Sequence, residues 1–136
     1  MPGTDDRHPH PHRQRALVLF IEDNLTQLDL YAMVLREKCD VVTATRGETG
    51  YELASSEHPD AIVLDVLLPD VDGLTLCERL RANPSTASIP VIVLTGDDGA
   101  YARAQLVRSE LTGVLLKPCP ADRLFSAVRQ AVERHP

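Results

Sequence analysis

The chain has 136 residues, of which 43% are hydrophobic and 25% charged, and its formal net charge is −6. This length predicts one domain with an aliphatic core and no second domain. The acidic balance disfavours nucleic-acid binding by this domain, because phosphate contacts need clustered lysine and arginine. Three cysteines without a metal-ligand spacing, and the lack of a signal-peptide pattern or a membrane-length apolar run, indicate a cytoplasmic protein without a membrane segment.

Residues 1–15 are expected to form a disordered N-terminal tail, followed by the folded domain at 16–134. The tail contains proline, histidine and charged residues without periodicity. His8, His10 and His12 alternate and could bind a metal. Because proline-rich, flexible backbone does not preorganise ligands, a solvated tail is the favoured interpretation.

From residue 16 onward, short apolar runs alternate with longer amphipathic segments. The apolar runs predict strands at 17–21, 41–44, 61–65, 91–95 and 113–117. The amphipathic segments predict helices at 24–38, 46–57, 73–82, 98–110 and 120–135. The first helix is expected to begin at the cap Asn24 and to place five residues on one face: Leu25, Leu28, Tyr31, Ala32 and Leu35.

Strands that alternate with helices predict an α/β fold with a parallel sheet, because parallel neighbours need crossover connections. Five of each indicate a doubly wound, five-stranded parallel sheet with helices on both faces. In such a sheet, ligands bind beyond the carboxyl ends of the strands.

Polar or small residues occupy the ends of four of the five predicted strands, and we expect them to meet on one rim of the sheet. They are Glu22 and Asp23 after the first strand, Asp65 at the end of the third, Thr95 and Gly96 at the fourth, and Lys117 and Pro118 at the fifth.

Three carboxylates that lie close together repel one another, and a bound cation commonly reduces this repulsion. Oxygen ligands suit Mg²⁺, which often bridges carboxylates to a phosphoryl group. Lys117 would add a fixed positive charge, Thr95 a hydroxyl donor, and Gly96 room for a bulky group. Taken singly, these residues could equally be a helix cap, a solvated lysine, a strand former and a turn glycine; their shared position favours a site.

The segments FIEDN, DVLLPDVDG, VIVLTG and LLKP, in this order and spacing, resemble those of response-regulator receiver domains. These domains are the phosphoacceptor modules of two-component signalling and have a flavodoxin-like fold. The resemblance covers residues 16–134.

The resemblance implies that Asp65 accepts a phosphoryl group from a histidine kinase or a phosphotransfer protein. Asp23 would bind Mg²⁺ directly and Glu22 through water, and the Leu67 carbonyl would complete the metal shell. Such a domain catalyses its own phosphorylation and dephosphorylation without being a conventional turnover enzyme.

Further implications concern the phosphoryl group and its surroundings. Thr95 and Lys117 would contact the phosphoryl oxygens, and the Lys117–Pro118 peptide is expected to be cis. As a separate hypothesis, Leu67 and Asp97 would tune the lifetime of the phosphoryl group, because both lie beside the path of attacking water.

One departure from the family pattern affects the expected switch. Receivers usually carry Tyr or Phe where this chain has Val114, so coupling between Thr95 and an inward-turning ring is in doubt. Tyr101 could take over part of that role, although packing is its favoured interpretation. The surface formed by 98–110, 113–117 and 120–135 is therefore expected to be atypical. The output domain or effector stays unknown, and a homodimer is a family-based expectation.

Three alternatives stay open. A haloacid-dehalogenase-like phosphatase would need an acid where Leu67 stands, and a flavodoxin-like cofactor binder would not place Glu22 and Asp23 beside a phosphate. An inactive receiver that serves as a docking or dimerisation module is the stronger rival. Cys77 and Cys119 are interpreted as small core residues.

Overall fold

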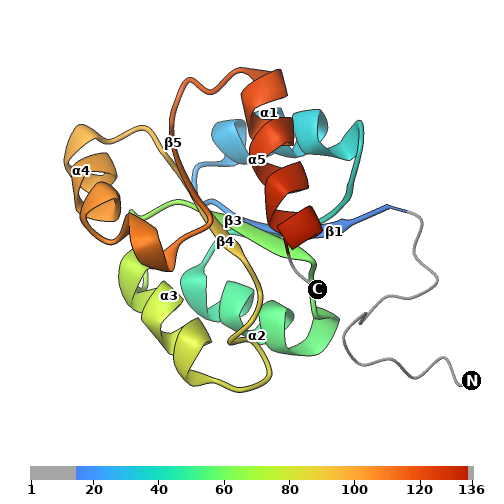
Figure 1. Cartoon of the computed structure of the whole chain (residues 1–136). Coiled ribbons are helices and arrows are strands. Elements are labelled where there is room, and N and C mark those ends of the chain that lie inside the picture. The colour runs from blue at the N-terminus through green and yellow to red at the C-terminus, as the bar shows by residue number, and fades with distance from the viewer. Residues whose placement is uncertain (1–14, 135–136) are drawn as a thin grey trace, which may run out of the picture.

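The computed structural model describes residues 15–134, and Figure 1 shows the arrangement of its elements. The strands are β1 (Leu17–Ile21), β2 (Asp40–Ala44), β3 (Ala61–Leu64), β4 (Val91–Thr95) and β5 (Gly113–Leu116). The helices are α1 (Leu25–Arg36), α2 (Gly47–Glu57), α3 (Gly73–Ala82), α4 (Asp98–Leu106), the 3₁₀ helix η1 (Arg108–Glu110) and α5 (Ala121–Arg134).

All five strands run parallel in one sheet with the order β2-β1-β3-β4-β5. The predicted doubly wound α/β fold is therefore confirmed. The register places Ile21 opposite Leu64, and Thr95 opposite Leu116. Since each of these residues stands at or near the end of its strand, the residues that follow emerge side by side at one rim.

Alternate side chains of each strand enter two separate cores. Val18 and Phe20 of β1 pack with α1 and α5, whereas Leu19 and Ile21 pack with α2, α3 and α4. Figure 1 shows the helix pair α1 and α5 on one side of the sheet and α2 and α3 on the other. Burial on both faces explains why the strands are continuous apolar runs rather than alternating ones.

Two expectations about helices differ from the structure. Leu25 was placed on the buried face of the first helix, but its side chain is 65% exposed. It stands in the first turn, next to the rim, and only the later members of that stripe reach the core. The helix predicted at 98–110 is divided: α4 ends at Leu106, and η1 follows after Val107.

The amino edge of the sheet brings the first strand and the last helix together. Ala16 and Glu133 line one small cavity there, of about 240 Å³. Arg15, the last residue of the expected tail, donates hydrogen bonds to the carbonyl oxygens of Arg36 and Cys39. The rest of that tail, with His8, His10 and His12, lies outside the described residues.

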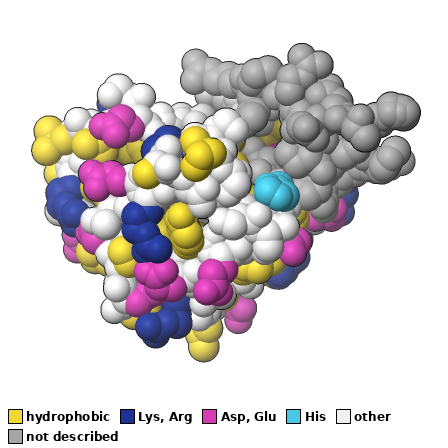
Figure 2. Space-filling view, turned by 90° about the horizontal axis from the view of Figure 1, so that it is seen from below, with side chains coloured by type: hydrophobic (Ala, Val, Ile, Leu, Met, Phe, Trp, Pro, Cys, Tyr) yellow, Lys and Arg dark blue, Asp and Glu magenta, His cyan; other side chains and the backbone are white. Residues whose placement is uncertain are grey.

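On the face seen in Figure 2, basic and acidic side chains are interspersed. A basic and an acidic residue pair across the α2–α3 interface, where Arg79 lies 2.5 Å from Glu48. None of the described helices combines the length and apolar character needed to cross a membrane.

Candidate functional site

The rim predicted from the strand ends encloses a pocket of about 570 Å³, which we call the rim pocket. Its lining includes every predicted site residue except Val114. The lining residues are Glu22, Asp23, Asn24, Gln27, Leu30, Tyr31, Asp65, Leu67, Thr95, Gly96, Asp97, Lys117 and Pro118.

Lys117 joins two carboxylates at the base of this pocket. Its Nζ lies 2.5 Å from the Oε1 of Glu22 and 3.2 Å from the Oδ2 of Asp65. Glu22 is almost fully buried and Asp65 is 8% exposed. Two acids can share this small volume because the ammonium group lies between them.

The pKa directions follow from this arrangement. Burial raises the pKa of Glu22, although hydrogen bonds from Lys117 and from the Asn24 N–H act against the rise. Burial alone would lower the pKa of Lys117, but the hydrogen bonds and charges of Glu22 and Asp65 outweigh burial and raise it. Lys117 therefore stays a permanent cation in the pocket.

Backbone contacts fix the position of Asp65. Its N–H donates to the Ile21 carbonyl at 3.2 Å, and its Oδ1 accepts from the Leu67 N–H at 3.2 Å. The start of α3 presses against the same backbone, because a Cβ on Gly73 would lie only 2.4 Å from the Asp65 carbonyl oxygen. Glycine at position 73 is thus required by a close approach of two backbone segments.

The loop after β1 supplies the other acids. The Glu22 N–H donates to the Ala44 carbonyl at 2.9 Å, and the Glu22 Oε2 accepts from the Asn24 N–H at 3.1 Å. Asn24 caps α1, as predicted, through its Oδ1 and the Gln27 N–H. Asp23 stands between them in the sequence; it is exposed and lines the rim pocket.

The chemical type of the donor atoms in the rim pocket suits a hard cation. Glu22, Asp23 and Asp65 offer only oxygen atoms, as does the Leu67 carbonyl, which is the ligand class that Mg²⁺ prefers. Within residues 15–134, however, no three acidic, histidine or cysteine side chains are drawn together as a metal cluster. Lys117 instead holds Glu22 and Asp65.

Thr95 is fully buried at the end of β4, where its Oγ1 accepts a long hydrogen bond of 3.4 Å from the Asp97 N–H. Its carbonyl accepts from the Lys117 N–H at 2.8 Å. The Lys117–Pro118 peptide is cis, as expected. A Cβ added to Gly96 would make ordinary contacts of 3.6 Å with Lys117, so space alone does not require a glycine there.

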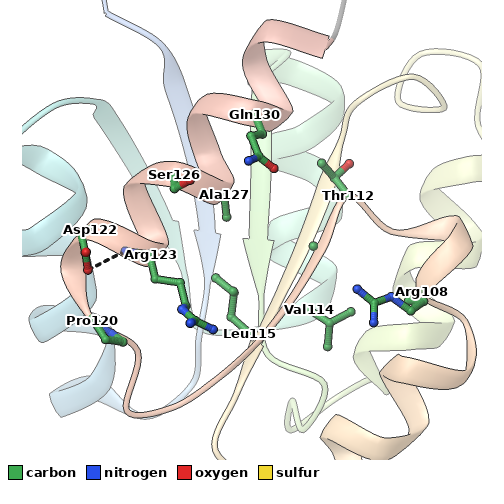
Figure 3. Close-up of a pocket in the computed structure, with 11 residues that line it drawn as sticks. Arg108, Thr112, Val114, Leu115, Pro120, Asp122, Arg123, Ser126, Ala127 and Gln130 are labelled. Carbon is green, nitrogen blue, oxygen red and sulfur yellow. Dashed lines mark hydrogen bonds between the residues drawn. The ribbon is translucent and has the colours of Figure 1, made fainter.

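Val114, which occupies the position whose coupling to Thr95 was in doubt, does not line the rim pocket. It packs against the core beside α2, α3 and α4 and lines a second cavity of about 580 Å³, which we call the β5 hollow. Figure 3 shows Val114 and Leu115 of β5 between Arg108 on one side and Arg123 of α5 on the other. The described side chains therefore do not bring Thr95 and Val114 into one pocket.

Sequence reasoning missed the role of Tyr31 in this pocket. The residue was assigned to the apolar face of the first helix, which it does share, since it is 4% exposed. It also lines the rim pocket, and its hydroxyl accepts a 3.0 Å hydrogen bond from the Cys119 N–H. Helical periodicity carries no signal for such a contact between distant segments.

The three cysteines are buried and unpaired, in agreement with the assignment of Cys77 and Cys119 to the core. Burial raises the pKa of Cys39 and Cys119, and it raises the pKa of Cys77 to about 12. These thiols therefore stay protonated and unreactive near neutral pH.

Comparison with known proteins agrees with the fold and the rim. The family model described as response regulator receiver domain matches residues 18–129. The response regulator PleD of Caulobacter vibrioides is 38% identical over 80% of this chain. The DNA-binding dual master transcriptional regulator RpaA of Synechocystis is 36% identical over 86% of it. The match spans only 24% of PleD and 49% of RpaA.

Solved structures lead to the same family. The signal receiver domain of a signal transduction histidine kinase from Syntrophus aciditrophicus has a TM-score of 0.77 and 30% identity, with 88% of this chain and 91% of that chain covered. The receiver domain of the Pseudomonas aeruginosa sensor histidine kinase PA1611, crystallised with magnesium in its active-site cleft, shares the fold with a TM-score of 0.79 at 23% identity over 88% and 98%. The chain belongs to the response regulator receiver domain family, which places it in two-component signalling.

Proposed function

We propose that this domain is an active phosphoacceptor and that Asp65 receives the phosphoryl group. The observation that carries the proposal is the Asp65 carboxylate at the open end of a buried strand, with the Lys117 ammonium 3.2 Å away. A carboxylate held in this way is a positioned nucleophile beside a fixed cation.

In the proposed reaction, an Asp65 oxygen attacks the phosphorus of a phosphohistidine on a histidine kinase or a phosphotransfer protein. A P–O bond forms while the P–N bond breaks, and the histidine leaves with the electron pair of that bond. Lys117 stabilises charge on the phosphoryl oxygens. The Thr95 hydroxyl would donate a hydrogen bond to one of them, and Gly96 leaves that approach open.

Mg²⁺ held by Glu22, Asp23, Asp65 and the Leu67 carbonyl would supply the additional positive charge that phosphoryl transfer needs. The all-oxygen donor set supports this assignment, and the structural relative from P. aeruginosa is described with magnesium in its cleft. Asp23 is the donor best placed to bind first, because Lys117 already engages the other two acids.

The direct test is incubation of the full chain with a small phosphodonor and Mg²⁺, followed by mass spectrometry. We expect the protein to gain the mass of one phosphoryl group. No gain is expected when the metal is chelated before the reaction, or in Asp65→Asn. An unlabelled wild-type protein with a native fold would instead favour the docking-module alternative.

Several finer properties extend the proposal. Leu67 is 49% exposed and lines the rim pocket, and Asp97 lines it while capping α4, which supports the hypothesis that both influence the approach of water to the phosphoryl group. We expect Leu67→Gln to change the rate of label loss; an unchanged rate would contradict this role.

We further propose that phosphorylation changes the α4–β5–α5 surface and that the output passes through an attached domain or an effector. We also propose a phosphorylation-dependent homodimer, which sedimentation with a beryllofluoride mimic would test.

Localisation and nucleic-acid contacts are also proposals. Three buried, unpaired cysteines support a reducing compartment such as the cytoplasm. The net charge of −6 supports a domain that does not contact nucleic acid itself, even if the protein that contains it regulates transcription, as RpaA is named to do.

A further inference from the structure

We propose that Tyr31 is a positioning residue that sets the place of Lys117 in the rim pocket; this inference rests on the proposed function of that pocket. Tyr31 belongs to α1, the helix that begins directly after the acidic pair, whereas Lys117 follows β5. A single side chain therefore connects the segment that carries the acids to the segment that carries the lysine.

Two separate contacts carry the proposal. The Tyr31 hydroxyl accepts a buried 3.0 Å hydrogen bond from the Cys119 N–H, beyond Pro118. The Lys117 Nζ lies 6.0 Å from the centroid of the Tyr31 ring, at the outer limit of a cation–π contact. The hydroxyl thus holds the backbone after the lysine, and the ring faces its charged end.

The short segment from Lys117 to Cys119 depends on this anchor. At its start, the Lys117 N–H donates to the Thr95 carbonyl at 2.8 Å. Pro118 has no N–H, so the next backbone donor is that of Cys119, and Tyr31 takes it. A buried N–H without an acceptor is costly, and the segment is expected to shift to satisfy it if the hydroxyl is removed.

The position of the ammonium group matters because its two carboxylate contacts are short. A shift of the segment would change the distances from Nζ to Glu22 and Asp65, which are 2.5 and 3.2 Å. Electrostatic stabilisation depends on donors that are already in place when charge develops. Tyr31 touches neither Asp65 nor the transferred group in this account, so its effect is exerted through Lys117.

The chain offers a matched control at Tyr51. This tyrosine lies on α2, on the other side of the sheet, and its hydroxyl accepts a 3.0 Å hydrogen bond from the Asn83 Nδ2. Tyr31→Phe and Tyr51→Phe each remove one hydroxyl that accepts one hydrogen bond. Only the first of these changes concerns the rim pocket.

The experiment compares wild type, Tyr31→Phe, Tyr31→Leu and Tyr51→Phe as full chains. Its two readouts are the rate of Asp65 phosphorylation by a small phosphodonor at saturating Mg²⁺ and the denaturant midpoint of each protein. Tyr31→Phe is expected to slow phosphorylation about fivefold, the factor that one hydrogen bond commonly represents. Tyr31→Leu, which also loses the ring, should be slower still, and Tyr51→Phe should match wild type.

A second readout needs neither metal nor phosphodonor. In the metal-free protein, NMR should show that the Cys119 amide and the Lys117 ammonium resonances move in Tyr31→Phe and stay in place in Tyr51→Phe. If the Lys117 resonances stay in place in Tyr31→Phe, or if its rate equals that of Tyr51→Phe, the positioning role is wrong. Absence of label in the wild type would overturn the proposed function instead, and the NMR comparison would still decide the role of Tyr31.

Discussion

The Nζ of Lys117 lies 3.2 Å from the Oδ2 of Asp65 and still closer to the Oε1 of Glu22, so one ammonium group contacts two acids that follow neighbouring strands and offsets part of their negative charge. Replacement of Lys117 by Met would keep most of the volume and remove the charge. We expect phosphorylation to slow by about 100-fold, the loss typical of removing one preorganised donor. The measurement is the initial rate of label incorporation at saturating Mg²⁺.

Lys117→Arg is the matched control for charge, because it keeps the cation but changes its shape and reach. It should recover part of the rate. If Lys117→Met and wild type are phosphorylated equally fast, the ammonium group has no part in the transfer.

Gly73 supports Asp65 from behind, since a Cβ at this position would overlap the Asp65 carbonyl oxygen and the Val66 Cα. Gly73→Ala is expected to lower the free energy of unfolding by about 1 to 3 kcal/mol, the usual cost of overpacking, and to slow phosphorylation by displacing the acceptor. Gly113→Ala is the control, because its Cβ would meet only ordinary contacts from 3.6 Å outward. Urea denaturation and labelling rates of both variants would show whether the effect is confined to position 73.

The β5 hollow gives a direct test of the switch. The chain has no tryptophan, so Val114→Trp would provide a unique fluorescence signal at the position where receivers usually carry an aromatic residue. We expect a folded protein, because the adjoining hollow of about 580 Å³ can accept the larger ring. If Thr95 is coupled to this position, emission should change on addition of beryllofluoride and Mg²⁺, and it should not change in an Asp65→Asn background. Constant emission in a protein shown by mass to carry the phosphoryl group would exclude the coupling.

We predict that the stability of the fold depends on pH through the carboxylate of Asp72. Burial opposes its ionisation, but the hydrogen bond from Arg103 and those from the N–H groups of Leu74 and Thr75 outweigh burial and lower the pKa of Asp72. The charged form is therefore favoured in the folded state, and its contribution is present above the unfolded-state pKa of about 3.9 and lost as the pH falls through the lower folded-state pKa.

Asp72→Ala should accordingly cost about 1 kcal/mol of unfolding free energy at neutral pH, as expected for loss of a helix cap. The difference from wild type should narrow as the pH falls below about 4. Denaturant unfolding at a series of pH values would measure this difference, with Asp29→Ala as a control, since Asp29 is exposed and its side chain has no described hydrogen bond or ion pair. If the difference in unfolding free energy between Asp72→Ala and wild type stays constant down to the most acid pH, the carboxylate of Asp72 does not cause the pH dependence.

The rim could be predicted because strand ends are local features of the sequence. Continuous apolar runs marked the buried strands, and parallel order required that Glu22, Asp65, Thr95 and Lys117 emerge at one edge. The structure confirms this convergence. The cap Asn24 was also readable, because an N-cap contact spans only a few residues.

Contacts between distant segments could not be predicted in the same way. The pairing of Lys117 with Glu22 as well as Asp65 depends on the depth of each side chain, and the hydrogen bond from Cys119 to Tyr31 depends on how α1 packs beside the loop that leads into α5. Leu25 illustrates the converse error: the helical pattern placed it on the buried face, but it stands in the first turn beside the rim, where the core no longer covers it.

The meeting of Ala16 and Glu133 in one small cavity at the amino edge has a practical consequence. Glu22 and Pro118 line the rim pocket. Glu22 follows the end of β1 and Pro118 precedes the start of α5, so each stands at the opposite end of its element from Ala16 and Glu133. A dye, an affinity handle or a solid support coupled near Arg15 would therefore leave the pocket mouth open to solution. Under the proposed function, a protein immobilised in this way should be phosphorylated by a small phosphodonor at the same rate as the free protein.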